Sequence, residues 1–135
     1  MTVRWQGDKV LREVRQAVLK GLVRGTELVR EEAITSILST QKTGRLYRRR
    51  SITHQASAAG ETPASDTGRL VNSITTEINE VELAGVINAG TAYAAALEFG
   101  TAKMAERPYM RPALAKHRES IEVDIAKAIR SALAS

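Results

Sequence analysis

Basic side chains form the most concentrated chemical feature of this sequence. Five of them, and no acid, lie between residues 41 and 60: Lys42, Arg45, Arg48, Arg49 and Arg50. Guanidinium groups around one aromatic ring, here Tyr47, could bind phosphates and stack on a base. Short arginine clusters also bind acidic protein surfaces, and no helix-turn-helix, zinc-finger or aromatic RNA-binding pattern accompanies this one. The cluster therefore predicts contact with a neighbouring subunit, a partner protein or passing DNA.

Residues that could support catalysis are scattered. His54 and His117 lack the spacing of a metal-ligand pair, and no HExxH motif, phosphate loop or nucleophile elbow is present. The absence of cysteine excludes disulfides and thiolate metal sites. Glu98 lies between two large apolar residues, and we expect it to form a structural ion pair with Arg107 or Arg111. The sequence thus predicts a protein that is not an enzyme and has no metal or cofactor.

Composition indicates one folded domain covering residues 1–135. Apolar residues make up 43% and charged residues 26% of the chain, an ordinary balance for a folded protein. No apolar run approaches the roughly 20 residues that cross a bilayer, and no secretory signal precedes the first helix. We therefore expect no membrane contact and a cytosol-like compartment.

Charge is unevenly distributed along the chain. The net charge is +5, but residues 41–60 carry five bases and no acid, whereas residues 61–100 carry one base and six acids. A basic segment followed by an acidic one predicts contacts between charged surfaces, either within one subunit or between copies.

Hydrophobic periodicity predicts an α+β fold, in which a small antiparallel sheet packs against a long N-terminal helix and a C-terminal helix. Residues 41–64 are rich in small and basic residues and predict a long extended arm, within which 45–51 and 52–55 could pair weakly. Gly21 and Gly25 lie one turn apart, which predicts a bend or the close approach of another backbone. The expected elements are a strand at 2–6, a helix at 9–39, a helical turn at 66–70, strands at 74–79 and 83–88, a helix at 93–99 closed by Gly100, and a last helix from Pro112.

Two stretches predict local structure in more detail. Asp66 can cap the short turn after the arm, and Gly68 can permit its backbone conformation. In the following helix, we expect Tyr93, Leu97 and Phe99 to present one apolar face to the core.

The loop before the last helix contains two Arg-Pro pairs, Arg107-Pro108 and Arg111-Pro112. They predict a stiff loop whose guanidinium groups point outward or onto Glu98. Such a loop could brace the subunit internally or contact a neighbouring one.

Three segments together resemble the phage protein family typified by gene product ten of phage HK97. They are HQASAAGETPASDTGRLVNSI (54–74), YAAALEFGTAKMAERPYMRPAL (93–114) and the lead-in TGRLYRRR (43–50). The departures are small: Tyr109 stands where the family commonly has Phe, and an Ala replaces the usual Pro in the ASAAGE stretch.

The resemblance implies a structural virion protein at the head–tail junction of a tailed bacteriophage or prophage-derived particle. Such a neck or tail-component protein forms a homo-oligomeric ring, for which tail symmetry favours six copies and a portal match would give twelve. Its partners would be the adjacent head-completion and tail proteins, with non-specific contact to passing DNA, and its location the virion and, during assembly, the host cytoplasm. The alternatives are a tail terminator that caps the tail tube and, from another class, a basic DNA-binding accessory protein.

Overall fold

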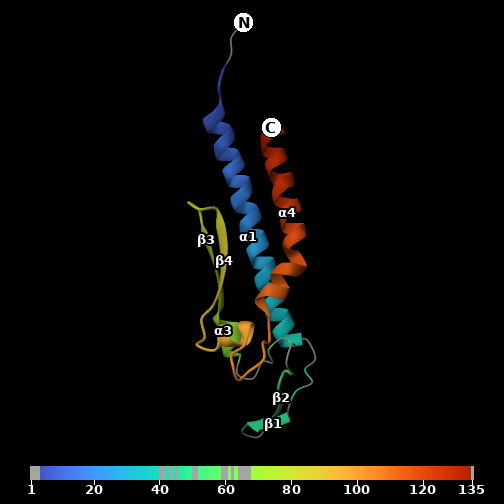
Figure 1. Cartoon of the computed structure of the whole chain (residues 1–135). Helices are drawn as coiled ribbons and strands as arrows, with labels where there is room; N and C mark the ends of the chain where they lie inside the picture. Colours follow the sequence, from blue (N-terminus) through green and yellow to red (C-terminus); the bar gives the residue numbers. More distant parts are fainter. Residues whose placement is uncertain are drawn as a thin grey trace.

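Helix α1, Gly7–Ser39, is the longest element of the computed structural model (Figure 1). At roughly 1.5 Å per residue it spans about 50 Å. The structure describes residues 4–39, 42, 44, 46–49, 52–58, 61, 63 and 68–134. Helix α4, Met110–Ala134, runs antiparallel to α1 along most of its length, so that the two chain termini lie at the same end of the helix pair.

The predicted close approach at Gly21 and Gly25 is confirmed. A Cβ atom at Gly21 would lie 2.6 Å from Cγ1 of Ile125, and one at Gly25 would lie 2.8 Å from Cγ2 of Ile121. Non-bonded carbon atoms do not approach this closely, so a larger residue at either position would push α4 away from α1. The two glycines therefore set the separation of the two long helices.

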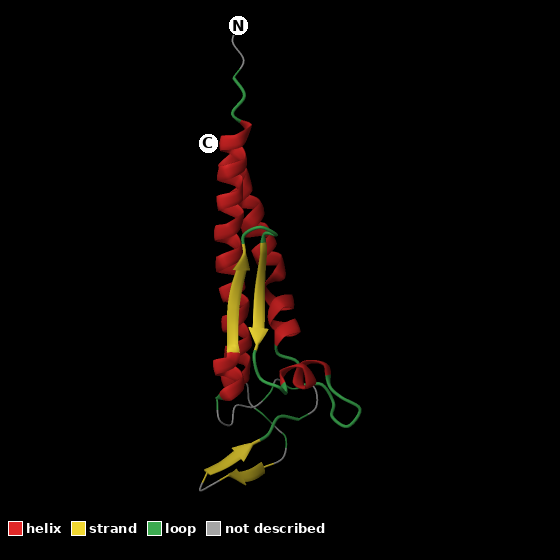
Figure 2. Ribbon diagram, turned by 90° about the vertical axis from the view of Figure 1, so that its left-hand side faces the viewer, coloured by secondary structure: helices red, strands yellow, loops and turns green. Residues whose placement is uncertain are grey.

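A two-stranded antiparallel sheet covers another side of α1. Strand β3, Ile74–Asn79, pairs with β4, Ala84–Ala89, with Ile74 opposite Ala89 (Figure 2). Along β3, buried or half-buried residues alternate with exposed ones, as expected for a strand with one face on a helix. Two polar contacts hold the sheet to α1: Arg30 Nε donates to the Ile74 carbonyl oxygen at 3.1 Å, and the Thr76 hydroxyl donates to Oε1 of Glu27 at 2.8 Å.

The core forms where the C-terminal half of α1, the start of α4 and the base of the sheet meet two short helices, α2, Arg69–Ser73, and α3, Ala94–Phe99. Gly68, which precedes α2, has φ of 77°, and Gly100, which ends α3, has φ of 75°; both values favour glycine. The buried apolar residues of this core are Val29, Ala33, Ile37, Leu70, Ile74, Ala94, Tyr109 and Ala113.

The α+β arrangement is as predicted, with two differences at the N-terminus. Helix α1 begins at Gly7, two residues before the expected start at residue 9, and the strand expected at 2–6 is wrong for residues 4–6, which belong to no strand. A strand needs a partner for its backbone groups, and the described strands pair only as β1–β2 and β3–β4. Residues 2 and 3 of the expected strand, and the expected cap Asp66, lie outside the described residues.

The weak pairing predicted within the arm is confirmed. Strand β1, Leu46–Arg49, pairs antiparallel with β2, Ile52–Gln55, and Tyr47 lies opposite His54. This hairpin lies beyond the C-terminal end of α1, away from the β3–β4 sheet (Figure 1).

Among the described residues, no helix is long and apolar enough to cross a membrane.

Candidate functional site

Glu98 organises the segment that carries the second family-like motif. It lies in α3 and is only 4% exposed. Its Oε2 accepts the backbone N–H groups of Tyr109 and Met110 at 2.8 and 2.9 Å, and its Oε1 accepts that of Arg111 at 2.8 Å. These N–H groups belong to the first turn of α4 and have no partner within the helix. The carboxylate therefore caps α4 from a different helix and also compensates the positive end of its dipole.

Arg111 closes this cap from the solvent side. Its Nε donates to Oε1 of Glu98 at 3.0 Å, and its Nη2 donates to the Glu98 carbonyl oxygen and to Oε2 of Glu106, the latter at 2.9 Å. The guanidinium carbon also lies 4.9 Å from the centre of the Phe99 ring, a cation–π contact. We call this set, Glu98, Phe99, Glu106, the Tyr109 and Met110 amides and Arg111, the Glu98 clamp.

The clamp changes the acidity of its buried groups. Burial alone would raise the pKa of Glu98, but the three backbone N–H donors and the Arg111 guanidinium outweigh it and hold the pKa below its usual value. Burial, and to a smaller degree the Glu98 charge, raises the pKa of Tyr109 to about 12. Its hydroxyl donates to the Ala94 carbonyl oxygen at 3.3 Å. Both groups therefore keep one charge state at neutral pH, as structural groups do.

The ion pair predicted between Glu98 and either Arg107 or Arg111 is confirmed for Arg111. Arg111 pairs with the carboxylate, but Arg107 does not: its Nε donates to the Ser57 carbonyl oxygen at 3.2 Å, next to the arm hairpin. Pro108 is half-buried in the loop, and Pro112 is the third residue of α4, where a missing N–H is tolerated. One Arg-Pro pair thus supports the clamp, and the other ties the loop to the base of the arm.

The apolar face predicted for α3 is wrong at two of three positions. Tyr93 is 42% exposed and Phe99 is 66% exposed, whereas Leu97 packs against the core. The helix instead buries Ala94 and Glu98, which lie one turn apart. Glu98 can occupy the inward position because its hydrogen bonds offset the free-energy cost of removing the carboxylate from water. The next residue, Phe99, then points outward and lies under Arg111.

The structure describes the side chains of two of the predicted basic contact residues, Arg48 and Lys42, and neither belongs to the clamp. Arg48 is exposed on β1. Lys42 is half-buried and its Nζ donates to the Ser36 carbonyl oxygen at 3.1 Å, in the last turn of α1; burial lowers its pKa, partly offset by Glu61. Arg45, Arg50 and the side chain of Arg49 lie outside the described residues.

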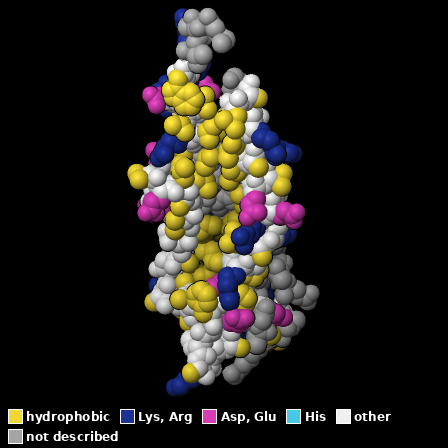
Figure 3. Space-filling model, turned by 45° about the horizontal axis from the view of Figure 1, so that its top comes forward, with side chains coloured by type: hydrophobic (Ala, Val, Ile, Leu, Met, Phe, Trp, Pro, Cys, Tyr) yellow, Lys and Arg dark blue, Asp and Glu magenta, His cyan; other side chains and the backbone are white. Residues whose placement is uncertain are grey.

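Much of the apolar surface of the long helices is uncovered. Figure 3 shows apolar side chains gathered in a strip between α1 and α4, toward the end where the termini lie. There the β3–β4 sheet and the short helices no longer add a third layer. Large exposed apolar residues on the two helices include Leu11, Val23, Leu38, Leu114, Val123 and Leu133. Exposed apolar surface of this kind marks sites of protein contact.

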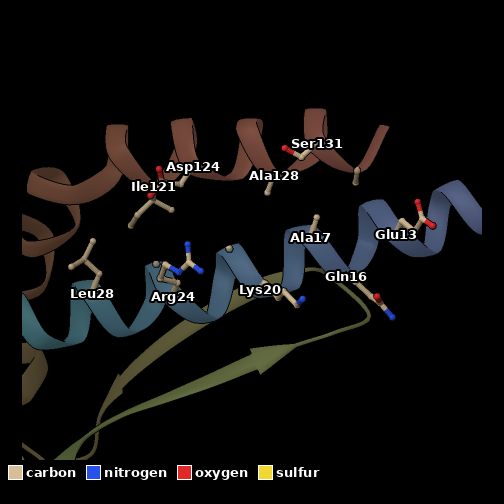
Figure 4. Close-up of a pocket in the computed structure, with 13 residues that line it drawn as sticks. Glu13, Gln16, Ala17, Lys20, Arg24, Leu28, Ile121, Asp124, Ala128 and Ser131 are labelled. Carbon is tan, nitrogen blue, oxygen red and sulfur yellow. The ribbon is translucent and has the colours of Figure 1, made fainter. Parts of the chain in front are cut away.

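A shallow groove of about 470 Å³ also lies between α1 and α4 (Figure 4). Its floor is made of small residues, including Ala17, Gly21 and Ala128, and charged side chains such as Lys20 and Asp124 line its rim. The described residues include no group of three His, Cys, Asp or Glu that could hold a metal ion.

Sequence reasoning missed one polar contact between the long helices. Glu32 of α1 accepts Lys116 Nζ at 2.8 Å and lies 3.3 Å from Nε2 of His117 in α4. These two partners lower the pKa of Glu32. The two partners lie more than 80 positions from Glu32 in the sequence. This contact could be predicted only if the register of the two helices were known.

Comparison with known protein families, curated proteins and solved structures found no match for this chain.

Proposed function

We propose that this protein is a structural component of the head–tail junction of a tailed phage or prophage-derived particle, where it assembles as a ring. The observation that carries the proposal is the organisation of segment 93–114, which combines the resemblance to phage neck proteins with the Glu98 clamp. Three of the motif's charged residues, Glu98, Glu106 and Arg111, fix the start of α4 against α3. These interactions fix the conformation of segment 93–114, and a subunit of an assembly needs such a fixed conformation.

The surface supports the same proposal. A subunit with two long helices and few layers leaves apolar side chains such as Leu11 and Leu133 exposed. Burying apolar surface stabilises association by about 25 cal/mol per Å², so uncovered helices favour contact with other proteins. The basic hairpin β1–β2 extends from the opposite end of the subunit and offers a second, charged contact. One subunit thus has contact surfaces at both ends of its long axis.

The direct test is assembly of the purified protein and of the particle that contains it. We expect native mass spectrometry to give a closed oligomer, of six copies by tail symmetry or twelve by a portal match. Removing the gene should leave full heads and separate tails that do not join, and electron cryomicroscopy should place the ring between them. A ring at the end of tails made without heads would instead favour the tail-terminator alternative. A chain absent from purified particles would contradict the proposal.

The DNA-binding alternative makes a different prediction. If the arm served mainly to bind DNA, affinity for duplex would be high and would fall steeply with salt, because counterions are released on binding. We expect only weak, salt-sensitive binding, and loss of that binding when Arg48, Arg49 and Arg50 are changed together to Ala. Fluorescence anisotropy with labelled duplex measures both effects. Sub-micromolar affinity at physiological salt would favour the accessory-protein function over the structural one.

A further inference from the structure

Two outer surfaces lie on opposite sides of α1. Figure 4 shows α4 on one side of this helix and the β3–β4 hairpin on the other. Each therefore has one face on α1 and one face directed away from it. We call these outward faces the hairpin face and the α4 face.

The hairpin face is acidic. Glu77 and Val86 are cross-strand partners that both point outward, and Val86 is 40% exposed. The turn adds Val81 and Glu82, which are also exposed. Residues 74–89 contain three acids and no base. Glu80, the third acid, lies in a groove with Lys20 and Arg24 of the same subunit, so Glu77 and Glu82 carry the outward charge.

The α4 face is basic. Residues 116, 119, 123, 127 and 130, at spacings of three or four, form one exposed stripe on the side of α4 away from the residues that pack against α1. Lys116, Lys127 and Arg130 outnumber Glu119 on this stripe, and Val123 lies among them with 44% exposure. Because Lys116 already pairs with Glu32, the outward positive charge comes from Lys127 and Arg130.

The two faces also lie at similar heights along the helices. Ile121 faces Gly25 and Ile125 faces Gly21, so Val123 lies near the level of residue 23 of α1, and Gly85, which precedes Val86, faces Thr26. At about 1.5 Å per helical residue and about 3.3 Å per strand residue, Val86 and Val123 differ in height by about 8 Å. Arg15 binds the carbonyl oxygen of Glu80, and Ile125 faces Gly21. Arg130 lies five residues after Ile125 in α4, which runs antiparallel to α1. It therefore lies near the level of Arg15, beside the hairpin turn. Glu82 in the turn thus lies at a similar height to Lys127 and Arg130 on the opposite side of one subunit.

We infer that the hairpin face of one copy docks on the α4 face of the next copy, and that repetition of this contact closes the ring. The inference rests on the ring assembly proposed above and identifies its interface. Two different faces that meet head to tail generate a ring when the rotation closes. Cyclic symmetry relates copies without a shift along the ring axis, so similar heights on the two faces suit a ring whose axis runs along the helices. Val86 would pack near Val123, with Glu82 near Lys127 and Arg130.

Cross-linking tests this geometry directly, since the chain has no cysteine. Val86→Cys and Val123→Cys are combined in one chain and treated with a short bis-maleimide. We expect a ladder of products that ends at the copy number of the ring. Each single variant alone should stay uncross-linked, and an equimolar mixture of the two single variants should give dimers only. Both valines are partly exposed, so the fold should tolerate the changes.

The outcomes separate the interface from the proposed function. Native mass spectrometry of the wild type is measured first, and a chain that is monomeric both alone and in particles overturns both proposals. A ring that forms without Val86–Val123 products overturns the interface alone. A single Leu133→Cys variant reports on the apolar strip, and its cross-linking to itself would indicate a two-fold, face-to-face contact instead.

Charge exchange provides a second, independent measurement. The variants Glu77→Lys/Glu82→Lys and Lys127→Glu/Arg130→Glu each place like charges across the interface, and we expect self-association to weaken by about tenfold or more. Mixing the two variants restores opposite charges at every contact and should restore rings of even copy number. The matched control exchanges Arg118 and Glu122, an exposed ion pair within α4, and should leave assembly unchanged. Failure of the mixture to assemble better than either variant would overturn the inference.

Discussion

Replacing Glu98 by Ala is expected to destabilise the protein by about 3 kcal/mol, since a buried charged acceptor of several hydrogen bonds is removed. Three backbone N–H groups at the start of α4 would lose their acceptor, and Arg111 would lose its most buried partner. The start of α4 would then detach from α3, and Tyr109, which this contact holds in the core, would lose its position. Chemical denaturation followed by circular dichroism measures the change.

Glu106→Ala is the matched control. Glu106 also binds Arg111, but its side chain is 53% exposed, and an exposed ion pair contributes at most about 1 kcal/mol. A Glu98→Ala variant no less stable than Glu106→Ala would contradict the account of the clamp.

The pH dependence of stability provides a further check on Glu98. Its pKa in the folded protein is lowered from the usual value of 4.5. The stabilisation from this carboxylate is therefore complete above that value and is lost as the pH falls through the lower folded pKa. The advantage of the wild type over Glu98→Gln should be constant at neutral pH and shrink in acid. An advantage that grows in acid would contradict the lowered pKa.

The elements of this fold could be predicted because their signals are local. The apolar spacing of α1, the alternation of β3 and the glycine at the end of α3 depend on neighbouring residues only. The pair Gly21 and Gly25 also pointed correctly to a close helix contact, because few other features require two glycines one helical turn apart. In contrast, the strand expected at 2–6 depended on a pairing partner that alternation alone cannot supply.

The candidate site was harder to predict because it combines residues from separate elements. A carboxylate next to two Arg-Pro pairs indicated an ion pair, but its choice of Arg111 over Arg107 depends on where α4 begins relative to α3. The same geometry turns Phe99 outward, against the usual preference of large aromatic residues for the core. The similar heights of the hairpin and α4 faces depend on the register of three layers, for which the sequence carries no local signal.

Removing the arm hairpin is expected to abolish the joining of heads to tails while preserving the fold. The structure gives the site of the cut: the Gly44 N–H donates to the Ala56 carbonyl oxygen at 2.9 Å, so these residues are adjacent and a short Gly-Ser linker can replace residues 45–55. The deletion keeps Ser57, which accepts Arg107, and Lys42, which binds the end of α1. Since the long helices, the β3–β4 sheet and the clamp lie outside the cut, the melting temperature should change little.

Particle assembly should respond very differently, because the deletion removes Arg45, Arg48, Arg49 and Arg50 together with the hairpin that carries them. We expect the infectious titre to fall by several orders of magnitude, with heads and tails accumulating separately in electron micrographs. The full-length variant in which Arg48, Arg49 and Arg50 become Ala separates charge from length: an equal defect would assign the contact to the guanidinium groups, and normal joining would assign it to the hairpin backbone. Normal particles from the deleted protein would show that the arm is a passive loop, and the basic cluster would then need another explanation.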